Sequence, residues 1–306
     1  MDFHVDRLAL IGTGLINGSL ALALKKRGLV GEVVGAARRE ATVARAVELG
    51  ICDRGTTDLA AAVEGADIVV IGTPSGAAGR VAEAFAPGLA PKAIVTDVGS
   101  VKASIVTQVA PHLPDLTRFV PGHPVAGTEH SGPDAAFATL FEHRRCILTP
   151  LPETDPLATA RVRLMWQAVG SAVDEMTPEH HDRVLAITSH LPHLIAYTIV
   201  GTVDDLEEQA QSEVFKYAAG GFTDFTRIAA SDPVMWRDIF LNNKPAVLEM
   251  LGRFTEDLIA LQRAIRWDQG ETLEDIFTRT RAIRRGVVAA GQAYVRQPED
   301  PLATKP

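Results

Sequence analysis

The sequence predicts an α/β protein in which a doubly wound sheet is followed by an all-helical domain. Short apolar runs alternate with helical patterns over the first half of the chain, as in a parallel sheet covered on both faces. A glycine-rich turn joins the first apolar run to the first helical pattern. After Thr177 the strand-like runs give way to long apolar stretches of helical periodicity. We therefore expect a sheet domain at residues 1–176, a helical domain at 177–296 and a flexible tail at 297–306.

The expected strands are short, apolar and bounded by turn residues. Their ranges are Leu8–Ile11, Glu32–Ala36, Asp67–Ile71, Ala93–Thr96, Arg118–Val120, Arg145–Thr149 and Ala172–Met176. Helices are expected from Leu15 and at Glu40–Leu49, Gly79–Ala86, Val101–Ala110 and Pro156–Val169. A doubly wound sheet binds its ligands at the carboxyl ends of the strands. The loops expected there read GTPSG, DVGSVK and PGHPVAGTE.

Composition argues against several classes of protein. The 306 residues carry a formal charge of −8, which argues against binding to the phosphate backbone of nucleic acids. Two cysteines without a CxxC spacing predict neither a disulfide framework nor a thiolate metal site. The N-terminus lacks the basic segment of a signal peptide, and no apolar run approaches the ~20 residues of a spanning helix. We expect a cytoplasmic protein that does not enter a membrane.

The turn after the first strand is typical of dinucleotide-binding proteins. Gly12 and Gly14 let the backbone approach a pyrophosphate at the positive end of the helix that follows, which predicts a Rossmann-type domain. Asn17 stands where a third glycine usually lies, and this predicts a looser or rotated contact between helix and strand. The residues expected to bind the cofactor are Gly12, Thr13, Gly14, Leu15 and Ile16 in this turn, and Thr73 and Pro74 in the GTPSG loop.

The residues after the second strand indicate which nicotinamide cofactor binds. An NAD enzyme usually places an acid about 20 residues past the glycines, where it bonds the ribose 2′-hydroxyl. Here that position holds Ala36 and Ala37, followed by Arg38 and Arg39. Two guanidinium groups suit an adenosine 2′-phosphate, so the sequence favours NADP, with NAD possible. The alternative is two solvated arginines at the start of a helix.

One histidine lies in an unusual setting. His123 stands between Gly122 and Pro124 in the stretch FVPGHPVAGTEHSGP, where little regular structure is expected. It is either a turn histidine at the end of a strand or a general base at the mouth of a pocket. Its position after the strand at Arg118–Val120 places it at the edge of the sheet where ligands bind.

The second half of the chain is expected to be helical. Thr177 can cap a helix that begins with Pro178, and Pro192 predicts a kink in the long apolar stretch that follows. Ser189 and His193 lie four residues apart and therefore share a helix face. Further helical patterns cover Val214–Tyr217, Pro233–Leu241, Pro245–Arg266 and Leu273–Val295. Helices this apolar would expose a large patch in a monomer, so we expect a homodimer formed through the helical domain.

A series of motifs runs in one order over residues 7–295. The motifs are GTGLINGSLA, TDVGSVK, GHPVAGTEHSGP, LTP, TSHLPHLIA and GGFTDFTRIAASDPVMWRDIF. Together they resemble the prephenate/arogenate (cyclohexadienyl) dehydrogenase family of tyrosine biosynthesis. The resemblance implies an NAD(P)-dependent oxidative decarboxylation of prephenate, arogenate or both. It also implies that His123 is the base that takes the ring hydroxyl proton and that Ser100 orients this imidazole.

The same resemblance implies a set of substrate-binding residues. Arg227 resembles the clamp on a substrate carboxylate, a role that suits a forked cation; the alternative is an ion pair with Asp224. His193 and Ser189 match substrate-side residues, or else form a polar spot left by the proline kink. Thr128 and Glu129 resemble residues at the side-chain end of the substrate. Trp236 either forms a wall of the pocket or belongs to the core.

Two other functions remain open at this point. A β-hydroxyacid dehydrogenase or imine reductase of similar architecture would use Lys102 as its acid or base, and His123 would be incidental. A non-catalytic dimer that senses nucleotides would retain the fold without the activity. A metal site at His190 and His193, or at His180, His181 and Asp182, is not expected, because zinc spacings such as HExxH are missing.

Overall fold

The computed structural model describes residues 3–206, 213–214, 216–218 and 220–287. By compactness the chain divides into units of residues 1–250 and 251–306. The predicted boundary after residue 176 falls inside the first unit, in which α7 (Pro178–Leu185) contacts α5 (Ala103–Val109). The predicted tail from residue 297 lies outside the described residues.

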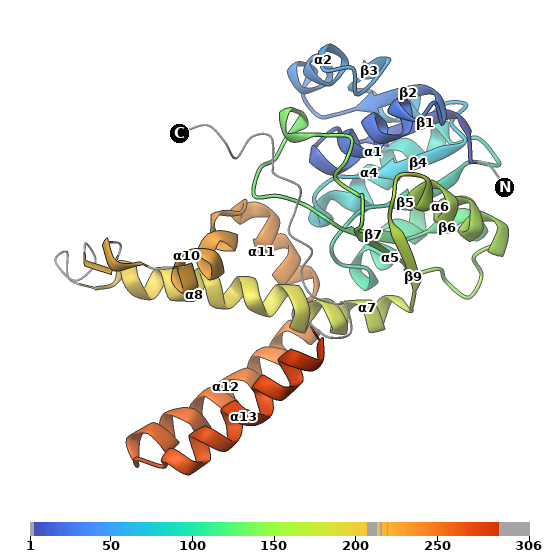
Figure 1. Ribbon diagram of the computed structural model, residues 1–306. Coiled ribbons are helices and arrows are strands. Elements are labelled where there is room, and N and C mark those ends of the chain that lie inside the picture. The colour runs from blue at the N-terminus through green and yellow to red at the C-terminus, as the bar shows by residue number, and fades with distance from the viewer. Residues whose placement is uncertain (1–2, 207–212, 215, 219, 288–306) are drawn as a thin grey trace. The chain divides into compact units, whose positions relative to one another are not determined.

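A six-stranded parallel sheet forms the centre of the first unit (Figure 1). Its order is β3-β2-β1-β4-β5-β6. The chain therefore begins in the middle of the sheet, adds β2 and β3 on one side of β1, and then adds β4, β5 and β6 on the other side. The strands are β1 (Val5–Ile11), β2 (Val30–Ala36), β3 (Arg54–Thr56), β4 (Ile68–Ile71), β5 (Ile94–Asp97) and β6 (Phe119–Val120). This order is that of a doubly wound dinucleotide-binding sheet, which confirms the predicted fold class. The short strand β3 was not predicted.

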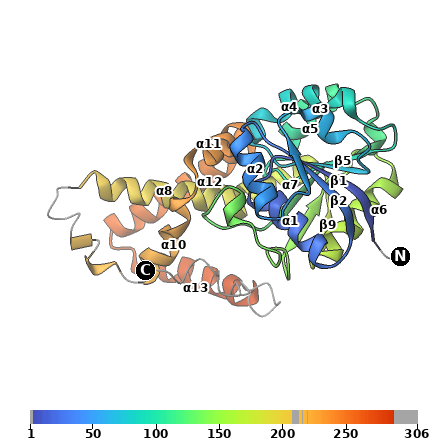
Figure 2. The same cartoon turned by 90° about the horizontal axis from the view of Figure 1, so that it is seen from above.

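Helices cover both faces of this sheet (Figure 2). Leu8 and Leu10 of β1 face one core with α1 (Leu15–Lys26), α2 (Glu40–Glu48) and α6 (Pro156–Ala168). Ala9 and Ile11 face a second core with α3 (Leu59–Val63), α4 (Ala78–Phe85) and α5. Because successive side chains of a strand point to opposite faces, the unbroken apolar run of β1 supplies both cores.

A separate three-stranded sheet carries the segment around His123. Its strands are β7 (Gly122–Val125), β8 (Arg145–Leu148) and β9 (Ala172–Glu175), in the order β7-β8-β9. β7 is antiparallel to β8, and β8 is parallel to β9. The sequence placed the last two runs in the main sheet and GHPV in a loop, and both expectations were wrong. β7 tolerates Pro124 because it is an edge strand, where a missing N–H donor leaves no gap in the ladder.

The helical part begins with the expected cap. Thr177 accepts a hydrogen bond from His180 N, and Pro178 is the first residue of α7. A π-helical turn at Ala186–His190 then joins α7 to α8 (Leu191–Asp204), just before Pro192, which confirms the predicted irregularity. Further helices among the described residues are α10 (Gly220–Thr226), α11 (Pro233–Asn242), α12 (Lys244–Arg266) and α13 (Gly270–Val287).

Among the described residues, one helical stretch is long and apolar enough to cross a membrane. It is Pro178–Asp204, with a mean hydropathy of 1.4, and it corrects the expectation that no run approached that length. His181 and Asp182 lie on its buried side and bond to other parts of the first unit. Only 28% of its apolar window is buried in the structure, and the ionisable His181 and Asp182 at its start would be costly in a bilayer.

Many apolar side chains of the long helices are exposed. In the second unit they are Leu258, Ile259, Ile265, Phe277, Ile283 and Val287, and Trp267 in the turn after α12 is exposed as well. In this unit α12 passes to α13 through a turn at residues 267–269, in which Asp268 has a φ of 51°. Exposed apolar surface of this extent is typical of a face that another protein surface covers.

Candidate active site

The glycine-rich turn has the geometry that a dinucleotide needs. Gly12 has a φ of 95°, and a Cβ there would lie 2.6 Å from the carbonyl oxygen of Gly72. Gly14 caps the N-terminus of α1, and a Cβ built on it would meet no atom within 4 Å. Leu15 and Ile16 form the first turn of that helix. The N–H groups of the first turn of α1 have no partner within the helix and lie at the positive end of its dipole.

Asn17 fills the place of the missing third glycine. Its Nδ2 donates to the carbonyl oxygens of Gly12, at 2.8 Å, and Val70, at 3.1 Å. A Cβ on Gly72 would lie 2.4 Å from that nitrogen, so the absent side chain of Gly72 makes the room. The contact between helix and strand is thus filled by hydrogen bonds, and of the looser or rotated contact that the sequence predicted, the looser form is not found.

Two hydroxyl groups beside the turn have spare hydrogen-bonding capacity. Thr13 Oγ1 and Thr73 Oγ1 are buried and have no partner among the described residues. Thr73 follows β4 with Gly72, and Pro74 precedes a short 3₁₀ turn at Ser75–Ala77. Buried polar groups normally find partners, so hydroxyls left over at the carboxyl ends of β1 and β4 fit a bound nucleotide.

Arg38 and Arg39 lie where the adenosine ribose of a dinucleotide would be expected. They follow β2 directly, and both side chains are exposed. Neither guanidinium forms an ion pair with a described residue, whereas most other arginines near the sheet do. Two cations without local anions are suited to a phosphate group.

His123 lies on β7 and is buried. Its side chain is 8% exposed, and its Nδ1 lies 2.8 Å from Nε2 of His181. Burial, and then the neighbouring His181, Lys102 and His190, hold the pKa of His123 well below its usual value of 6.5. The imidazole is therefore neutral near pH 7 and able to accept a proton.

His181 is in turn bonded to Asp182. His181 Nδ1 lies 2.8 Å from Asp182 Oδ1, and this carboxylate also accepts from the backbone N–H groups of Lys102 and Ala103. His181 and Asp182 share the buried face of α7 with Pro178 and Leu185. The sequence analysis weighed this pair only as metal ligands. The helical spacing from Pro178 to Leu185 was the signal that both side chains point inward.

Lys102 is fully buried and its ammonium group is occupied. Its Nζ contacts the carboxylate of Asp97 and the carbonyl oxygen of Gly122, the residue before His123. Asp97 also accepts from the backbone N–H of Gly122. Lys102 thus fixes the start of β7 through the Gly122 carbonyl. Because its ammonium group is buried and bonded to Asp97, this position counts against the alternative in which Lys102 acts on substrate as acid or base.

Ser100 follows β5 in the same loop as Lys102. Among the described residues its hydroxyl makes no hydrogen bond to His123, whose Nδ1 is bonded to His181 instead. The orienting role expected for Ser100 therefore remains a prediction.

Arg227 and Glu129 are brought together from distant parts of the chain. Arg227 Nη1 lies 3.2 Å from Glu129 Oε2, and no ion pair with Asp224 forms. Thr128, next to Glu129, accepts a hydrogen bond from His130 N. The expected carboxylate clamp and the expected side-chain end of the substrate site are thus in contact.

His193, Ser189 and Trp236 form one packed group. His193 Nδ1 donates to the carbonyl oxygen of Ser189 at 2.8 Å, and the imidazole stacks on Trp236 with ring centroids 3.6 Å apart. Burial, partly offset by the Ser189 carbonyl and reinforced by Arg227, lowers the pKa of His193. Trp236 is itself buried and packs with Val101 and Ile239, so it belongs to the core, and its role as a wall of the pocket stays a prediction.

Sequence reasoning missed two residues that connect these groups. His190 Nδ1 lies 3.0 Å from Nδ2 of Asn243, which also donates to the carbonyl oxygen of Asp182. The ring of His190 packs against the edge of Trp236, with centroids 6.1 Å apart. His190 and Asn243 therefore link the His181–Asp182 pair to the group around His193. Asn243 falls between the predicted helices Pro233–Leu241 and Pro245–Arg266, where an asparagine carried no signal for this role.

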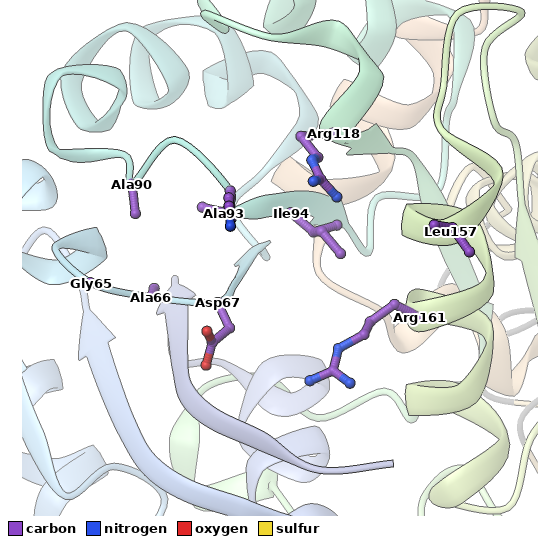
Figure 3. Close-up of a pocket in the computed structure, with 10 residues that line it drawn as sticks. Gly65, Ala66, Asp67, Ala90, Ala93, Ile94, Arg118, Leu157 and Arg161 are labelled. Carbon is purple, nitrogen blue, oxygen red and sulfur yellow. The ribbon is translucent and has the colours of Figure 1, made fainter. Parts of the chain in front are cut away.

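The pocket drawn in Figure 3 lies at the opposite end of the sheet. It has a volume of about 350 Å³ and is lined by residues that include Asp67, Ala93, Arg118, Leu157 and Arg161. Asp67 and Ala93 precede β4 and β5, so the pocket is at the amino ends of the strands. Ligands of such sheets bind at the carboxyl ends, and we do not assign this pocket to the site. Among the described residues, no group of three or more His, Cys, Asp or Glu is placed to hold a metal ion.

Comparison with known proteins identifies the family. Residues 20–175 match the family described as prephenate dehydrogenase, nucleotide-binding domain, and residues 177–279 match its dimerization domain. The cyclohexadienyl dehydrogenase of Zymomonas mobilis is 42% identical over 277 residues, which cover 90% of this chain and 94% of that protein. The prephenate dehydrogenase of Bacillus subtilis is 34% identical, covering 94% of this chain and 77% of that protein.

Solved structures agree with this result. The prephenate dehydrogenase of Aquifex aeolicus, solved with hydroxyphenyl propionate and NAD+, has a TM-score of 0.86 at 36% identity, covering 94% of this chain and all of that one. Synechocystis arogenate dehydrogenase has a TM-score of 0.77 at 30% identity, covering 92% and 99%. With these matches and the geometry described above, the chain belongs to the prephenate dehydrogenase family.

Proposed function

We propose that the protein oxidatively decarboxylates prephenate to 4-hydroxyphenylpyruvate, arogenate to tyrosine, or both. The observation that carries the proposal is the environment of His123. A buried imidazole at the ligand-binding end of a dinucleotide-binding sheet is held by one nitrogen and leaves the other free. The relatives named cyclohexadienyl, prephenate and arogenate dehydrogenase support this substrate class.

His123 is the general base in this proposal. A bound nicotinamide supplies the hydride acceptor, and the hydride leaves the ring carbon that bears the hydroxyl group. His123 Nε2 takes the hydroxyl proton as the hydride departs. The ring carboxylate then leaves as carbon dioxide, and the ring becomes aromatic. The lowered pKa of His123 keeps the imidazole neutral and ready near pH 7, and a base of this kind contributes about 10²–10⁴ in rate.

The polar groups around His123 hold the substrate. Arg227 binds a substrate carboxylate, for which a guanidinium offers two parallel hydrogen bonds. Glu129 and Thr128 line the side-chain end of the substrate. His193, fixed by Ser189 and Trp236, faces the same space. Ser100, in the loop that follows β5, orients His123 once substrate is bound; the described residues show no hydrogen bond between its hydroxyl and that imidazole.

The cofactor site takes NADP in preference to NAD. The turn from Gly12 to Ile16 holds the pyrophosphate, and Thr13, Thr73 and Pro74 line its sides. The unpaired Arg38 and Arg39 bind the 2′-phosphate. The relative from Aquifex aeolicus binds NAD+, so this preference is a property of the present sequence at residues 36–39.

The protein works as a cytoplasmic homodimer. The exposed apolar side chains of α12 and α13 and the match to a dimerization domain support an interface through the helical part. The two family matches meet between residues 175 and 177, which supports a nucleotide-binding domain at 1–176 and a helical domain at 177–296.

A four-way assay tests the proposed function. The purified protein is given prephenate or arogenate, each with NADP or NAD, and nicotinamide reduction is followed. We expect turnover with at least one substrate and a higher kcat/KM with NADP. Absence of turnover in all four combinations would contradict the proposed reaction, and equal kcat/KM values for the two cofactors would contradict the preference alone.

A further inference from the structure

Three buried side chains form a continuous hydrogen-bonded chain that ends at the proposed base. His123 Nδ1 lies 2.8 Å from His181 Nε2, and His181 Nδ1 lies 2.8 Å from Asp182 Oδ1. His181 and Asp182 are 0% and 5% exposed. The three residues come from two elements, β7 and the first turns of α7, which only tertiary packing brings together.

The carboxylate at the end of this chain fixes the position of every proton in it. Asp182 Oδ1 is an acceptor, so Nδ1 of His181 must carry the proton that bonds to it. His181 Nε2 is then the acceptor in a neutral imidazole, and His123 Nδ1 must donate to it. His123 Nε2 is left without a proton. Among the described residues this nitrogen has no hydrogen-bond partner, so its lone pair is available to a substrate hydroxyl.

We propose that His181 and Asp182 are positioning residues that hold His123 in this tautomer and share the proton that it receives. The proposal rests on the role of His123 as the base.

The proton needs a holding place during the reaction. It leaves the hydroxyl oxygen as hydride leaves the adjacent ring carbon, and it goes to His123 Nε2. The proton on His123 Nδ1 can then shift along the 2.8 Å contact to His181 Nε2, while His181 Nδ1–H stays bonded to Asp182. When carbon dioxide has left, the ring oxygen takes a proton back from His123 Nε2 and both imidazoles return to neutrality. No proton is gained or lost, and the hydride goes to the nicotinamide.

The groups around His123 favour placing the positive charge of the shared proton on His181. The charged or titratable groups that face it are Lys102 and Asp97 beneath β7, Cys146 on β8, His181 and Asp182 on α7, and His190 on the π-helical turn. Burial and the cation of Lys102 both oppose a positive charge on His123. A positive charge on His181 instead lies in direct contact with the carboxylate of Asp182. The relay from His123 to His181 thus places the positive charge beside the carboxylate of Asp182 while the proton from the substrate hydroxyl is held.

Substitution of His181 separates the two parts of the proposal. His181→Leu removes both the acceptor and the proton site, whereas His181→Gln keeps an acceptor oxygen that cannot take a proton. We expect His181→Leu to lower kcat by about 10- to 100-fold, the range for partners that orient a functional histidine, with unchanged KM for substrate and cofactor. His181→Gln should regain part of that loss. Wild-type kcat in either variant would overturn the relay.

A matched control excludes a general effect on α7. His180 is the next residue on the same helix, is exposed, and its side chain does not contact His123. His180→Leu should leave kcat and both KM values unchanged. Asp182 is less suitable as the main variant, because its carboxylate also accepts from two backbone N–H groups at the start of α5, and its loss would disturb that turn.

A spectroscopic test does not depend on activity. In ¹⁵N-histidine-labelled protein, long-range ¹H–¹⁵N correlations report the tautomer of each imidazole, and His123→Gln identifies the signals of His123. We expect His123 to carry its proton on Nδ1 in the wild type and to lose this preference in His181→Leu. The same tautomer in both proteins would overturn the positioning role. Full activity in His123→Gln would instead refute the proposed base itself, whereas an inactive His123→Gln beside a fully active His181→Leu would refute only the relay.

Discussion

Arg227 Nη1 lies 3.2 Å from Glu129 Oε2, although 98 positions separate the two residues in the sequence. The pair joins the 3₁₀ turn after α10 to the loop after β7. His123 lies on β7 itself. An exposed ion pair of this kind contributes little to folding, so stability does not explain it. We propose that Glu129 steadies this guanidinium so that its remaining N–H groups bind a substrate carboxylate.

Replacing Arg227 tests this interpretation. Hydrogen bonds to charged groups are worth about 1.5–3 kcal/mol, so Arg227→Ala should raise the KM for substrate by about 10- to 100-fold. Arg227→Lys should recover only part of the loss, because an ammonium cannot form two parallel bonds. The matched control is Arg145→Ala, which removes another exposed arginine–carboxylate pair, that with Asp174. Steady-state kinetics check all three, and an unchanged KM in Arg227→Ala would refute the clamp.

Arg38 and Arg39 should determine the choice of cofactor. Both guanidinium groups lack a described anionic partner, and only NADP brings a phosphate to them. The double variant Arg38→Ala/Arg39→Ala should raise the KM for NADP much more than the KM for NAD. The NAD measurement on the same variant serves as the control. Equal changes in the two KM values would show that the arginines are solvated residues at the start of α2.

Stability should fall when the solution is made mildly acidic. Burial is the main cause that lowers the pKa values of His123, His181, His190 and His193 in the folded protein. The unfolded chain therefore binds more protons below its ordinary histidine pKa near 6.5, and the free energy of unfolding falls as pH falls through that window. His190, with a pKa lowered to about 4, accounts for about 3 kcal/mol of this loss.

Denaturant unfolding at a series of pH values measures this effect. We expect constant stability above about pH 6.5 and a decline below it. His190→Gln should show a shallower decline, because it removes one group that must charge in the unfolded state. A stability that rises on acidification would mean that the buried histidines are already protonated in the folded protein.

The buried pair of Lys102 and Asp97 should be costly to break. Lys102→Met leaves the carboxylate of Asp97 buried without its cation, which should cost about 3–5 kcal/mol of stability. The matched control is Lys25→Met, since Lys25 also contacts one carboxylate and one backbone carbonyl, those of Asp53 and Gly50, but at the surface. That control should cost about 1 kcal/mol or less. Similar losses in the two variants would contradict the structural role of Lys102.

The sequence predicted the parts of the fold that depend on local pattern. Unbroken apolar runs identified β1 and β4, and the cap at Thr177 with Pro178 identified the start of α7. The sequence did not predict the strand β7, because Gly122 and Pro124 have poor strand propensity and the strand forms only by pairing with β8. Propensity describes a segment alone, and tertiary pairing overrode it here.

The site divides in the same way. His123, Arg227 and His193 were assigned to the site because each lies in a motif that resembles the family. His181, Asp182 and Asn243 were not assigned to the site, because their importance comes from which side chains they meet across the fold. The alternative weighed for Arg227 was an ion pair with Asp224, three residues before it, whereas the structure pairs it with Glu129. Long-range contacts of this kind leave no periodic signal in a single sequence.

The central claim is that His123 removes the ring hydroxyl proton in an oxidative decarboxylation. The most direct measurement is the steady-state kinetics of His123→Gln beside the wild type, with prephenate or arogenate and the preferred cofactor. We predict a kcat lower by about 10²–10⁴, with KM values for substrate and cofactor unchanged. A variant that keeps wild-type kcat would contradict the claim and would place the base elsewhere in the site.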